Sequence, residues 1–190
     1  MDKIILLDWD GPISNSRTWR MPKQVDPVAI QMLNDLTVAG WKTVLTSTVR
    51  KHFFADDSGN IRSDAEALEM ATQFMRDAGF MVQWYSPGNW CTDPGYTSKR
   101  YLEVANWLMN TEFDDTTIML VVDDERFPAE FIQRGKMQQI HANCDSGIDY
   151  LALNEAYSYA EMPELALCQS FQYSDPDEED EEDEEDDDDC

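Results

Sequence analysis

Residues 3–11 read KIILLDWDG, an apolar run that ends in two aspartates and a glycine. The run before Asp8 has the length and composition of a buried strand, whereas aspartate is disfavoured in strands. Asp8 and Asp10 therefore mark the point where the strand ends. Two interpretations are open: a turn that closes on Gly11, or a pair of carboxylates that holds a hard cation, which prefers oxygen ligands.

Five short apolar runs are spaced along the chain, and each ends at polar residues or a turn. They cover residues 3–7, 42–45, 80–85, 117–122 and 136–140. Helical patterns separate most of them, and strands that alternate with helices imply a parallel sheet covered on both faces. We therefore predict an α/β fold, a Rossmann-like three-layer sandwich around a mainly parallel five-stranded sheet. The short connection after Gly11 leaves no room there for a large cap.

Capping signals indicate where three helices begin. Asp26 and Pro27 are a typical helix start, and Ser63 with Glu66 fits a capping box. A third helix is expected to begin near Ser98. It is expected to carry the apolar residues Leu102, Ala105, Leu108 and Met109.

Charge divides the chain into two parts. Of its 39 acidic residues, 14 lie in residues 175–190, which contain no basic residue and have too little apolar surface to fold. We predict one domain at residues 1–170 and a disordered acidic tail at residues 175–190. The remaining 25 acids outnumber the 14 bases, which argues against a broad nucleic-acid-binding surface but not against a local site for one phosphate.

The sequence also limits the cellular setting that we expect. No apolar run approaches the roughly 20 residues that a membrane span requires, and residues 1–20 lack the apolar core of a signal peptide. The four cysteines do not occur in pairs at metal-ligand spacing, so a zinc site is not expected. We therefore expect a cytoplasmic protein without membrane contact.

Polar residues follow two other predicted strands, at the ends where parallel sheets bind ligands. The fourth run is followed by Asp123, Asp124 and Glu125, which either cap a helix or share a divalent cation. Hydroxyl residues beginning at Thr46 follow the second run and either donate to a phosphate or simply suit a strand end. Lys99 lies near a predicted helix start, where a cation opposes the helix dipole. It is either a solvated side chain or one directed at an anion.

Two acids, a hydroxyl, a lysine and two further acids thus follow one another along the chain, each at a strand or helix end. This order resembles the haloacid dehalogenase-like (HAD) superfamily. Its four motifs match here as Asp8-Trp9-Asp10-Gly11, Thr46, Lys99 and Asp123-Asp124. The chain is similar in particular to the HAD domains of prokaryotic and viral nucleic-acid repair proteins. That similarity lies in residues 44–50, 98–108 and 145–148.

The resemblance implies a Mg²⁺-dependent phosphomonoesterase that forms an aspartyl-phosphate on Asp8. Asp10 would protonate the leaving oxygen and then activate water. The implied metal ligands are Asp8, the main-chain carbonyl of Asp10, Asp123 and Asp124. The implied substrate-binding residues are Thr46, Ser47, Arg50 and Lys99, of which Thr46 and Lys99 also act in catalysis.

The predicted substrate is a phosphorylated nucleotide or a phosphorylated nucleic-acid end. A site without a large cap suits a nucleic-acid end, and a mononucleotide is the close rival. Four aromatic residues either stack on a base or anchor the loops in which they occur. They are Trp84, Tyr85, Trp90 and Tyr96.

A second hypothesis is a binding or decoy protein. In that case the acidic tail engages a basic protein partner, and the HAD-like fold serves as a carrier. A phosphatase assay at two salt concentrations, with and without residues 175–190, distinguishes the two hypotheses, because only the enzyme releases phosphate.

Overall fold

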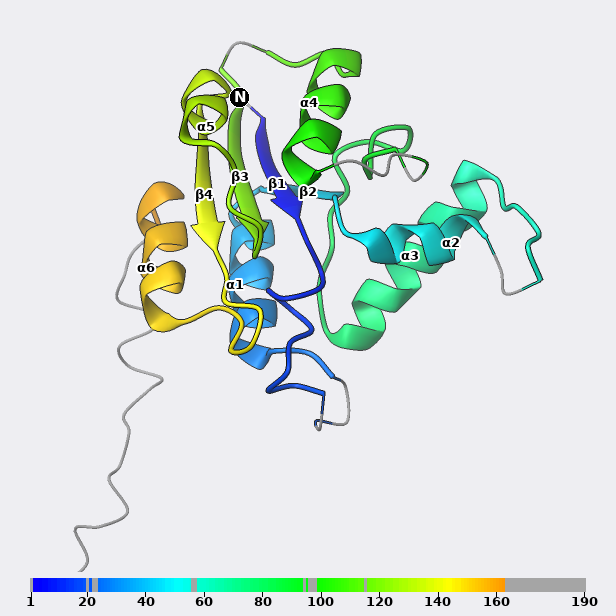
Figure 1. Cartoon of the computed structure of the whole chain (residues 1–190), viewed down its shortest axis with the longest axis horizontal. Helices are drawn as coiled ribbons and strands as arrows, with labels where there is room; N and C mark the ends of the chain where they lie inside the picture. The colour runs from blue at the N-terminus through cyan, green and yellow to red at the C-terminus, as the bar shows by residue number, and fades with distance from the viewer. Residues whose placement is uncertain are drawn as a thin grey trace, which may run out of the picture.

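The computed structural model describes residues 2–19, 21, 24–55, 58–93, 95, 99–114 and 116–162. These residues form one parallel sheet with helices around it (Figure 1). The strands are β1 (Lys3–Leu7), β2 (Lys42–Leu45), β3 (Ile118–Asp123) and β4 (Met137–His141), in the order β2-β1-β3-β4. The predicted α/β class and parallel sheet are confirmed. The predicted acidic tail lies outside the described residues.

Local capping explains where the helices begin. They are α1 (Pro27–Val38), α2 (Lys51–Phe54), α3 (Asp64–Ala78), α4 (Arg100–Asn110), α5 (Ala129–Arg134) and α6 (Tyr150–Tyr159), with a 3₁₀ helix η1 (Thr48–Arg50) before α2. Asp26 caps α1 by accepting a hydrogen bond from the Val28 N–H at 2.9 Å. Ser63 and Glu66 form both bonds of the predicted capping box of α3. None of the helices in the described part of the chain has the length and apolar character that crossing a bilayer requires.

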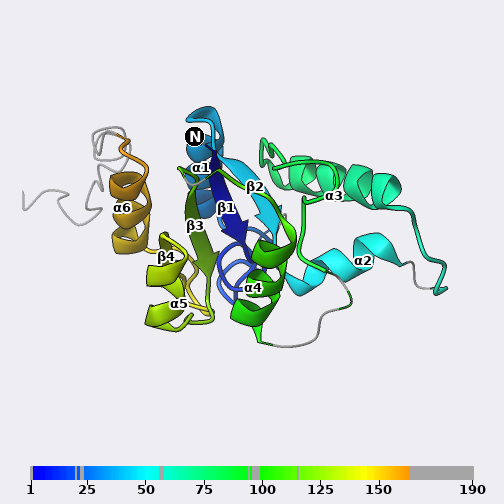
Figure 2. The same cartoon turned by 90° about the horizontal axis from the view of Figure 1, so that it is seen from above.

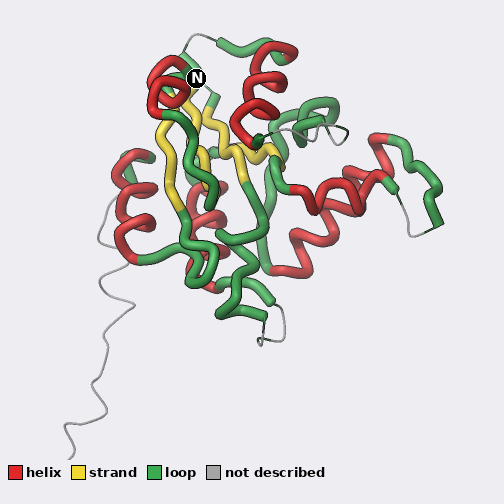
Figure 3. Tube along the Cα trace, viewed as in Figure 1, coloured by secondary structure: helices red, strands yellow, loops and turns green. Residues whose placement is uncertain are grey.

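Among the described residues the sheet has four strands, so the predicted fifth strand is not confirmed. Residues 80–85 touch the edge of β2 only through an isolated parallel bridge between Thr43 and Trp84. A turn that contains Pro87 follows, and proline cannot donate a ladder hydrogen bond. The chain therefore meets β2 again only at a second bridge, to Leu45. The described part of the connection between α3 and α4 is accordingly loop (Figure 3).

Each face of the sheet packs against different helices, because successive strand residues point to opposite sides. Ile5 and Leu7 lie in one core cluster with α1 and α6, whereas Ile4 and Leu6 lie in a second cluster with α4 and α5. Figure 2 shows α1 on one side of the sheet and α4 and α5 on the other. Helices α2 and α3 lie together beyond the β2 edge (Figures 1 and 2).

Of the four apolar residues expected on α4, Ala105 and Leu108 are half-buried and Leu108 packs against the second core cluster, but the most buried positions of the helix are others. Leu102 and Met109 are 36% and 78% exposed, and the buried residues of α4 are Glu103, Val104 and Trp107. An apolar pattern alone does not place a charged residue on the inner side of a helix. Here a glutamate faces inward because arginine side chains neutralise it, so the inner face is displaced around the helix from the apolar pattern.

Candidate active site

Thr46, Asp8 and Asp123 lie side by side at the carboxyl ends of three neighbouring strands. The sheet ladder continues past Leu7, because the Asp8 N–H donates to the Val122 carbonyl at 2.9 Å and the Thr46 N–H donates to the Leu7 carbonyl at 2.8 Å. Alternation along the strands then directs all three side chains to the face covered by α4. From β1 the chain runs to β2 on one side of β1, and it later reaches β3 on the other side. The row formed by Thr46, Asp8 and Asp123 therefore lies where the strand order reverses, which is where parallel sheets bind ligands.

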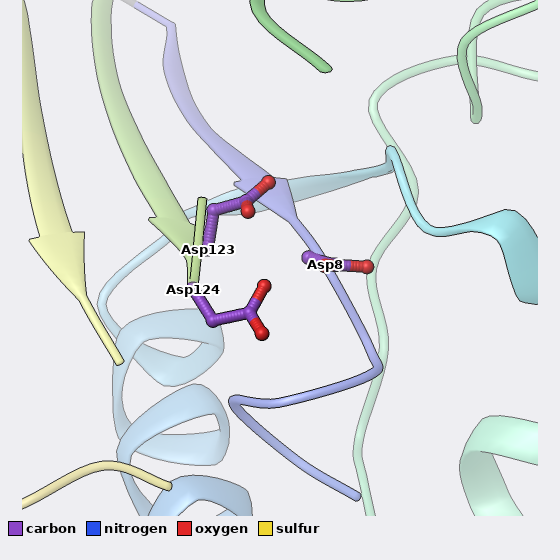
Figure 4. Close-up of side chains that lie close together, drawn as sticks. All are labelled: Asp8, Asp123 and Asp124. Carbon is purple, nitrogen blue, oxygen red and sulfur yellow. The ribbon is translucent and has the colours of Figure 1, made fainter. Parts of the chain in front are cut away.

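Asp8, Asp123 and Asp124 form a carboxylate cluster at the ends of β1 and β3 (Figure 4). Each side chain offers one oxygen, and these oxygens lie within 4.8 Å of one another. The Oδ1 atom of Asp123 accepts from the Glu125 N–H at 2.7 Å, but its buried Oδ2 has no hydrogen-bond partner among the described residues. A buried carboxylate oxygen that accepts no hydrogen bond suits a hard divalent cation, so the chemistry of this cluster is compatible with a divalent metal ion.

The electrostatics of the carboxylate cluster favour protons or a cation. Burial raises the pKa of Asp8 to about 6, and the nearby guanidinium of Arg100 opposes this rise. Burial also raises the pKa of Asp123, and the charge of Asp8 raises it further. The pKa of Asp124 is raised mainly by burial as well. Protons and a metal ion therefore compete for the same oxygens.

We expect the stabilisation by Mg²⁺ to grow as the pH rises from about 5 to about 8. Asp8 and Asp123 hold protons more tightly in the folded protein than in the unfolded chain. Without metal, the free energy of unfolding therefore falls as the pH rises through the raised pKa values of Asp8 and Asp123, because both side chains then lose the protons that the folded state favours. Melting curves with and without Mg²⁺ across this range measure the difference in Tm. A Tm difference that is the same at both ends of the range would contradict the prediction.

Gly11 allows Asp124 to lie against the turn that follows β1. Its φ of +91° is in the left-handed region, and a Cβ atom there would lie 2.6 Å from both Cγ and Oδ2 of Asp124. Gly40 is a natural control, because its φ is +88° but a Cβ atom would meet nothing within 4 Å. Both glycines have a left-handed φ, but of the two only Gly11 contacts the carboxylate cluster.

Gly11→Ala and Gly40→Ala should each lower the free energy of unfolding by about 1–2 kcal/mol, because alanine is strained at a left-handed φ. Gly11→Ala should in addition displace the Asp124 carboxylate and weaken Mg²⁺ binding by about tenfold or more. Denaturant unfolding measures the first effect and titration calorimetry the second. Equal Mg²⁺ affinity in the two variants would show that the Gly11 contact does not matter to the cluster.

Within the described residues, Arg100 is the cation paired with the carboxylate cluster. Its Nη2 lies 3.4 Å from Asp8 Oδ1, and its Nε lies 3.4 Å from Asp123 Oδ2. Burial lowers the pKa of Arg100, but the charges of Asp8, Asp123 and Glu103 outweigh this and raise it. Lys99, the predicted phosphate-binding cation, is the exposed N-cap residue of α4. The structure thus brings the neighbouring arginine, not the lysine, to the two aspartates.

Arg50 lies inside the protein rather than at a substrate-facing surface. It is 0% exposed, and its Nη1 donates to the carbonyls of Thr46 at 2.5 Å and Ser47 at 2.6 Å. Its Nη2 donates to Glu103 at 2.8 Å and to the Asp93 carbonyl at 3.2 Å. Arg50 therefore ties the end of β2 to α4, a different position from the predicted substrate contact.

The hydroxyl residues after β2 separate into two kinds. Ser47 and Thr48 each donate to the Oδ2 atom of Asp10 at 3.3 Å, which places Asp10 beside the β2 end and outside the carboxylate cluster. Thr46 is buried, and its hydroxyl has no hydrogen-bond partner among the described residues. Thr46 therefore lies in the row with Asp8, whereas Asp10 is hydrogen-bonded to the hydroxyls of Ser47 and Thr48.

The described aromatic candidates are packing residues. Trp90 is buried and donates to Asp64 at 3.0 Å, and Trp84 donates to Thr72 at 2.8 Å. Tyr85 packs edge-on against Trp107. These contacts favour the loop-anchor interpretation over base stacking. Tyr96 lies outside the described residues.

Two residues of the site, Arg100 and Glu103, lie in the stretch 98–108 noted for its resemblance, but the sequence analysis gave neither of them a role in the site. An arginine and a glutamate three positions apart at a helix start, in phase with Val104 and Trp107, were the available signal. Comparison of the chain with protein-family models, with curated proteins and with solved structures gives no match. A function is therefore inferred from the geometry of this site.

Proposed function

We propose that this chain is a Mg²⁺-dependent phosphomonoesterase that acts on the terminal phosphate of a nucleotide or a nucleic acid. The observation that carries the proposal is the row of Thr46, Asp8 and Asp123 with Arg100 beside the two carboxylates. A carboxylate nucleophile, metal-binding carboxylates and a fixed cation are parts that phosphoryl transfer requires. The strand order supports a Rossmann-like sandwich, in which this edge of the sheet is the usual ligand site.

The carboxylate cluster and the main-chain carbonyl of Asp10 would hold Mg²⁺. The three deprotonated aspartates carry three negative charges, and Arg100 supplies one positive charge. The remaining two negative charges match a divalent cation. Mg²⁺ would supply the charge neutralisation that lets a carboxylate approach an anionic phosphate.

The proposed reaction has two displacements at phosphorus. In the first, an oxygen of Asp8 forms a bond to phosphorus while the bond from phosphorus to the ester oxygen breaks, and Asp10 gives its proton to that oxygen. In the second, water attacks phosphorus, Asp10 takes the water proton, and the bond to Asp8 breaks. The products are an alcohol and inorganic phosphate. The hydroxyls of Ser47 and Thr48 support this role by holding the Asp10 carboxylate in place.

The surroundings of the row support an accessible substrate. Asp10 and Lys99 are exposed, so the side of the row that a leaving group would occupy faces solvent. In this proposal Arg100 contacts the phosphoryl group that is transferred. Lys99 is one residue away at the helix start and contacts a more distant phosphate. A second contact of that kind favours a nucleic-acid end, which carries further phosphates, over a nucleoside monophosphate, which has only the phosphate that is removed.

The proposal is tested by measuring Mg²⁺-dependent release of inorganic phosphate from a panel of substrates. The panel contains nucleoside monophosphates and oligonucleotides phosphorylated at the 3′ or the 5′ end, with an unphosphorylated oligonucleotide as control. We expect release from at least one phosphorylated class and none from the control. Absence of release from every member with Mg²⁺ present would overturn the proposal.

A further inference from the structure

A buried ion network connects α4 to the proposed active site. Glu103 is 5% exposed, and its Oε2 accepts from Arg50 Nη2 at 2.8 Å and from Arg100 Nη1 at 3.4 Å. Arg50 and Arg100 both donate to the carbonyl of Thr46 as well. A buried carboxylate is costly unless it is paired, so Glu103 depends on both guanidinium groups for its position.

The guanidinium of Arg100 is shared between two groups of acceptors. Its Nη1 is directed at the Thr46 carbonyl and Glu103, while Nη2 and Nε face Asp8 and Asp123. All three carboxylate contacts measure 3.4 Å, longer than the roughly 2.7–2.9 Å of a charge-assisted hydrogen bond. Glu103 and the Thr46 carbonyl, both reached by Nη1, therefore together offset the attraction of the carboxylate cluster, and Arg100 lies close to the cluster without bonding tightly to it.

We infer that Glu103 is a positioning residue that, fixed by Arg50, keeps the Arg100 guanidinium from collapsing onto the carboxylate cluster. Arg100 is then free to meet a phosphoryl oxygen, and the cluster remains open to a divalent cation. The inference rests on the proposed function for the part that concerns phosphate. Its structural part, the restraint of Arg100, holds independently of turnover.

A purely structural role makes a different prediction. The Glu103 and Arg50 pair also ties α4 to the end of β2, so its loss lowers the free energy of unfolding in either case. If stability were its whole contribution, loss of Glu103 would leave the position of Arg100 and the Mg²⁺ affinity unchanged. A direct electrostatic effect of Glu103 on the metal would, in contrast, persist when Arg100 is absent.

The test is a double-mutant cycle of Glu103→Gln and Arg100→Gln in the full chain, with Mg²⁺ affinity measured by titration calorimetry. We expect Arg100→Gln alone to tighten Mg²⁺ binding, because a competing cation is removed. Glu103→Gln alone should weaken it by about three- to thirtyfold, and should have no effect in the Arg100→Gln background. Equal effects of Glu103→Gln in both backgrounds would overturn the inference.

A crystal structure of the Glu103→Gln variant provides a second measurement that needs neither metal nor turnover. Arg100 should move from 3.4 Å to about 2.8 Å from Asp8 or Asp123. An unmoved guanidinium would overturn the inference. If Glu103→Gln does not fold, Glu103→Asp keeps the charge, withdraws the carboxylate by one methylene and should show the same shift in smaller degree. If Arg100 moves while the wild type releases no phosphate, the proposed function fails and the positioning role stands.

Discussion

Asp8→Asn should abolish phosphate release and leave the fold intact. The amide is nearly isosteric with the carboxylate but cannot form the bond to phosphorus, and loss of a nucleophile costs on the order of 10⁴- to 10⁶-fold in kcat. Because burial already raises the pKa of Asp8, a neutral side chain fits the site without an unfolding penalty. Without Mg²⁺ the variant should melt at or above the wild-type temperature.

The matched control for this prediction is Asp77→Asn. Asp77 is exposed on α3 and accepts from Gln73 at 2.7 Å, a bond that asparagine can also accept. This variant should release phosphate at the wild-type rate. Turnover of Asp8→Asn within tenfold of Asp77→Asn would refute the proposed nucleophile, since such a rate requires another group to attack phosphorus.

Mg²⁺ should stabilise the folded protein strongly, and Asp123 should be required for this. A ligand at one hundred times its Kd adds about 2.7 kcal/mol, which corresponds to a rise in Tm of about 5–10 °C for a chain of this size. Asp123→Asn should lose most of this rise, because it removes one of the three charged side chains of the carboxylate cluster. Chelation should also stop phosphate release by the wild type.

Glu125→Gln is the control for the metal prediction. Like Asp123→Asn, this substitution removes one negative charge, but from an exposed side chain that is outside the carboxylate cluster. The hydrogen bond from the backbone N–H of residue 125 to Asp123 is not affected. It should keep the wild-type rise in Tm. A wild-type melting temperature that does not change in saturating Mg²⁺, or an equal loss of the response in both variants, would contradict the prediction.

The sequence was informative about strand ends and caps because their causes are local. An aspartate directly after an apolar run marks a strand end, and this placed Asp8 and Asp123 at the correct edge of the sheet. The capping box at Ser63 needs only residues within one helical turn, and it is present as predicted. Parallel strands then bring such ends together whatever the length of chain between them.

The sequence was misleading where distant charges decide which side of an element is inside. Lys99 and Arg100 are adjacent cations, and only the packing of α4 shows which of them faces the strand ends. Arg50 follows a predicted strand as a polar residue, yet its side chain is completely buried. Glu103 and backbone carbonyls accept hydrogen bonds from its Nη1 and Nη2 atoms, and among the described residues only its Nε has no hydrogen-bond partner. Apolar periodicity cannot detect such an ion pair, and it therefore gives no sign that Glu103 is buried on the inner side of α4.

The two bridges beside β2 have a consequence for assembly. The outward N–H and C=O groups of Thr43 bond to residues 83 and 85, and those of Leu45 bond to residues 90 and 92. A short edge strand whose outward N–H and C=O groups already form hydrogen bonds cannot pair with a strand from another molecule. The proline-containing turn that prevents a fifth strand thus still leaves this side of the sheet closed to intermolecular strand addition, which protects the chain against aggregation along β2.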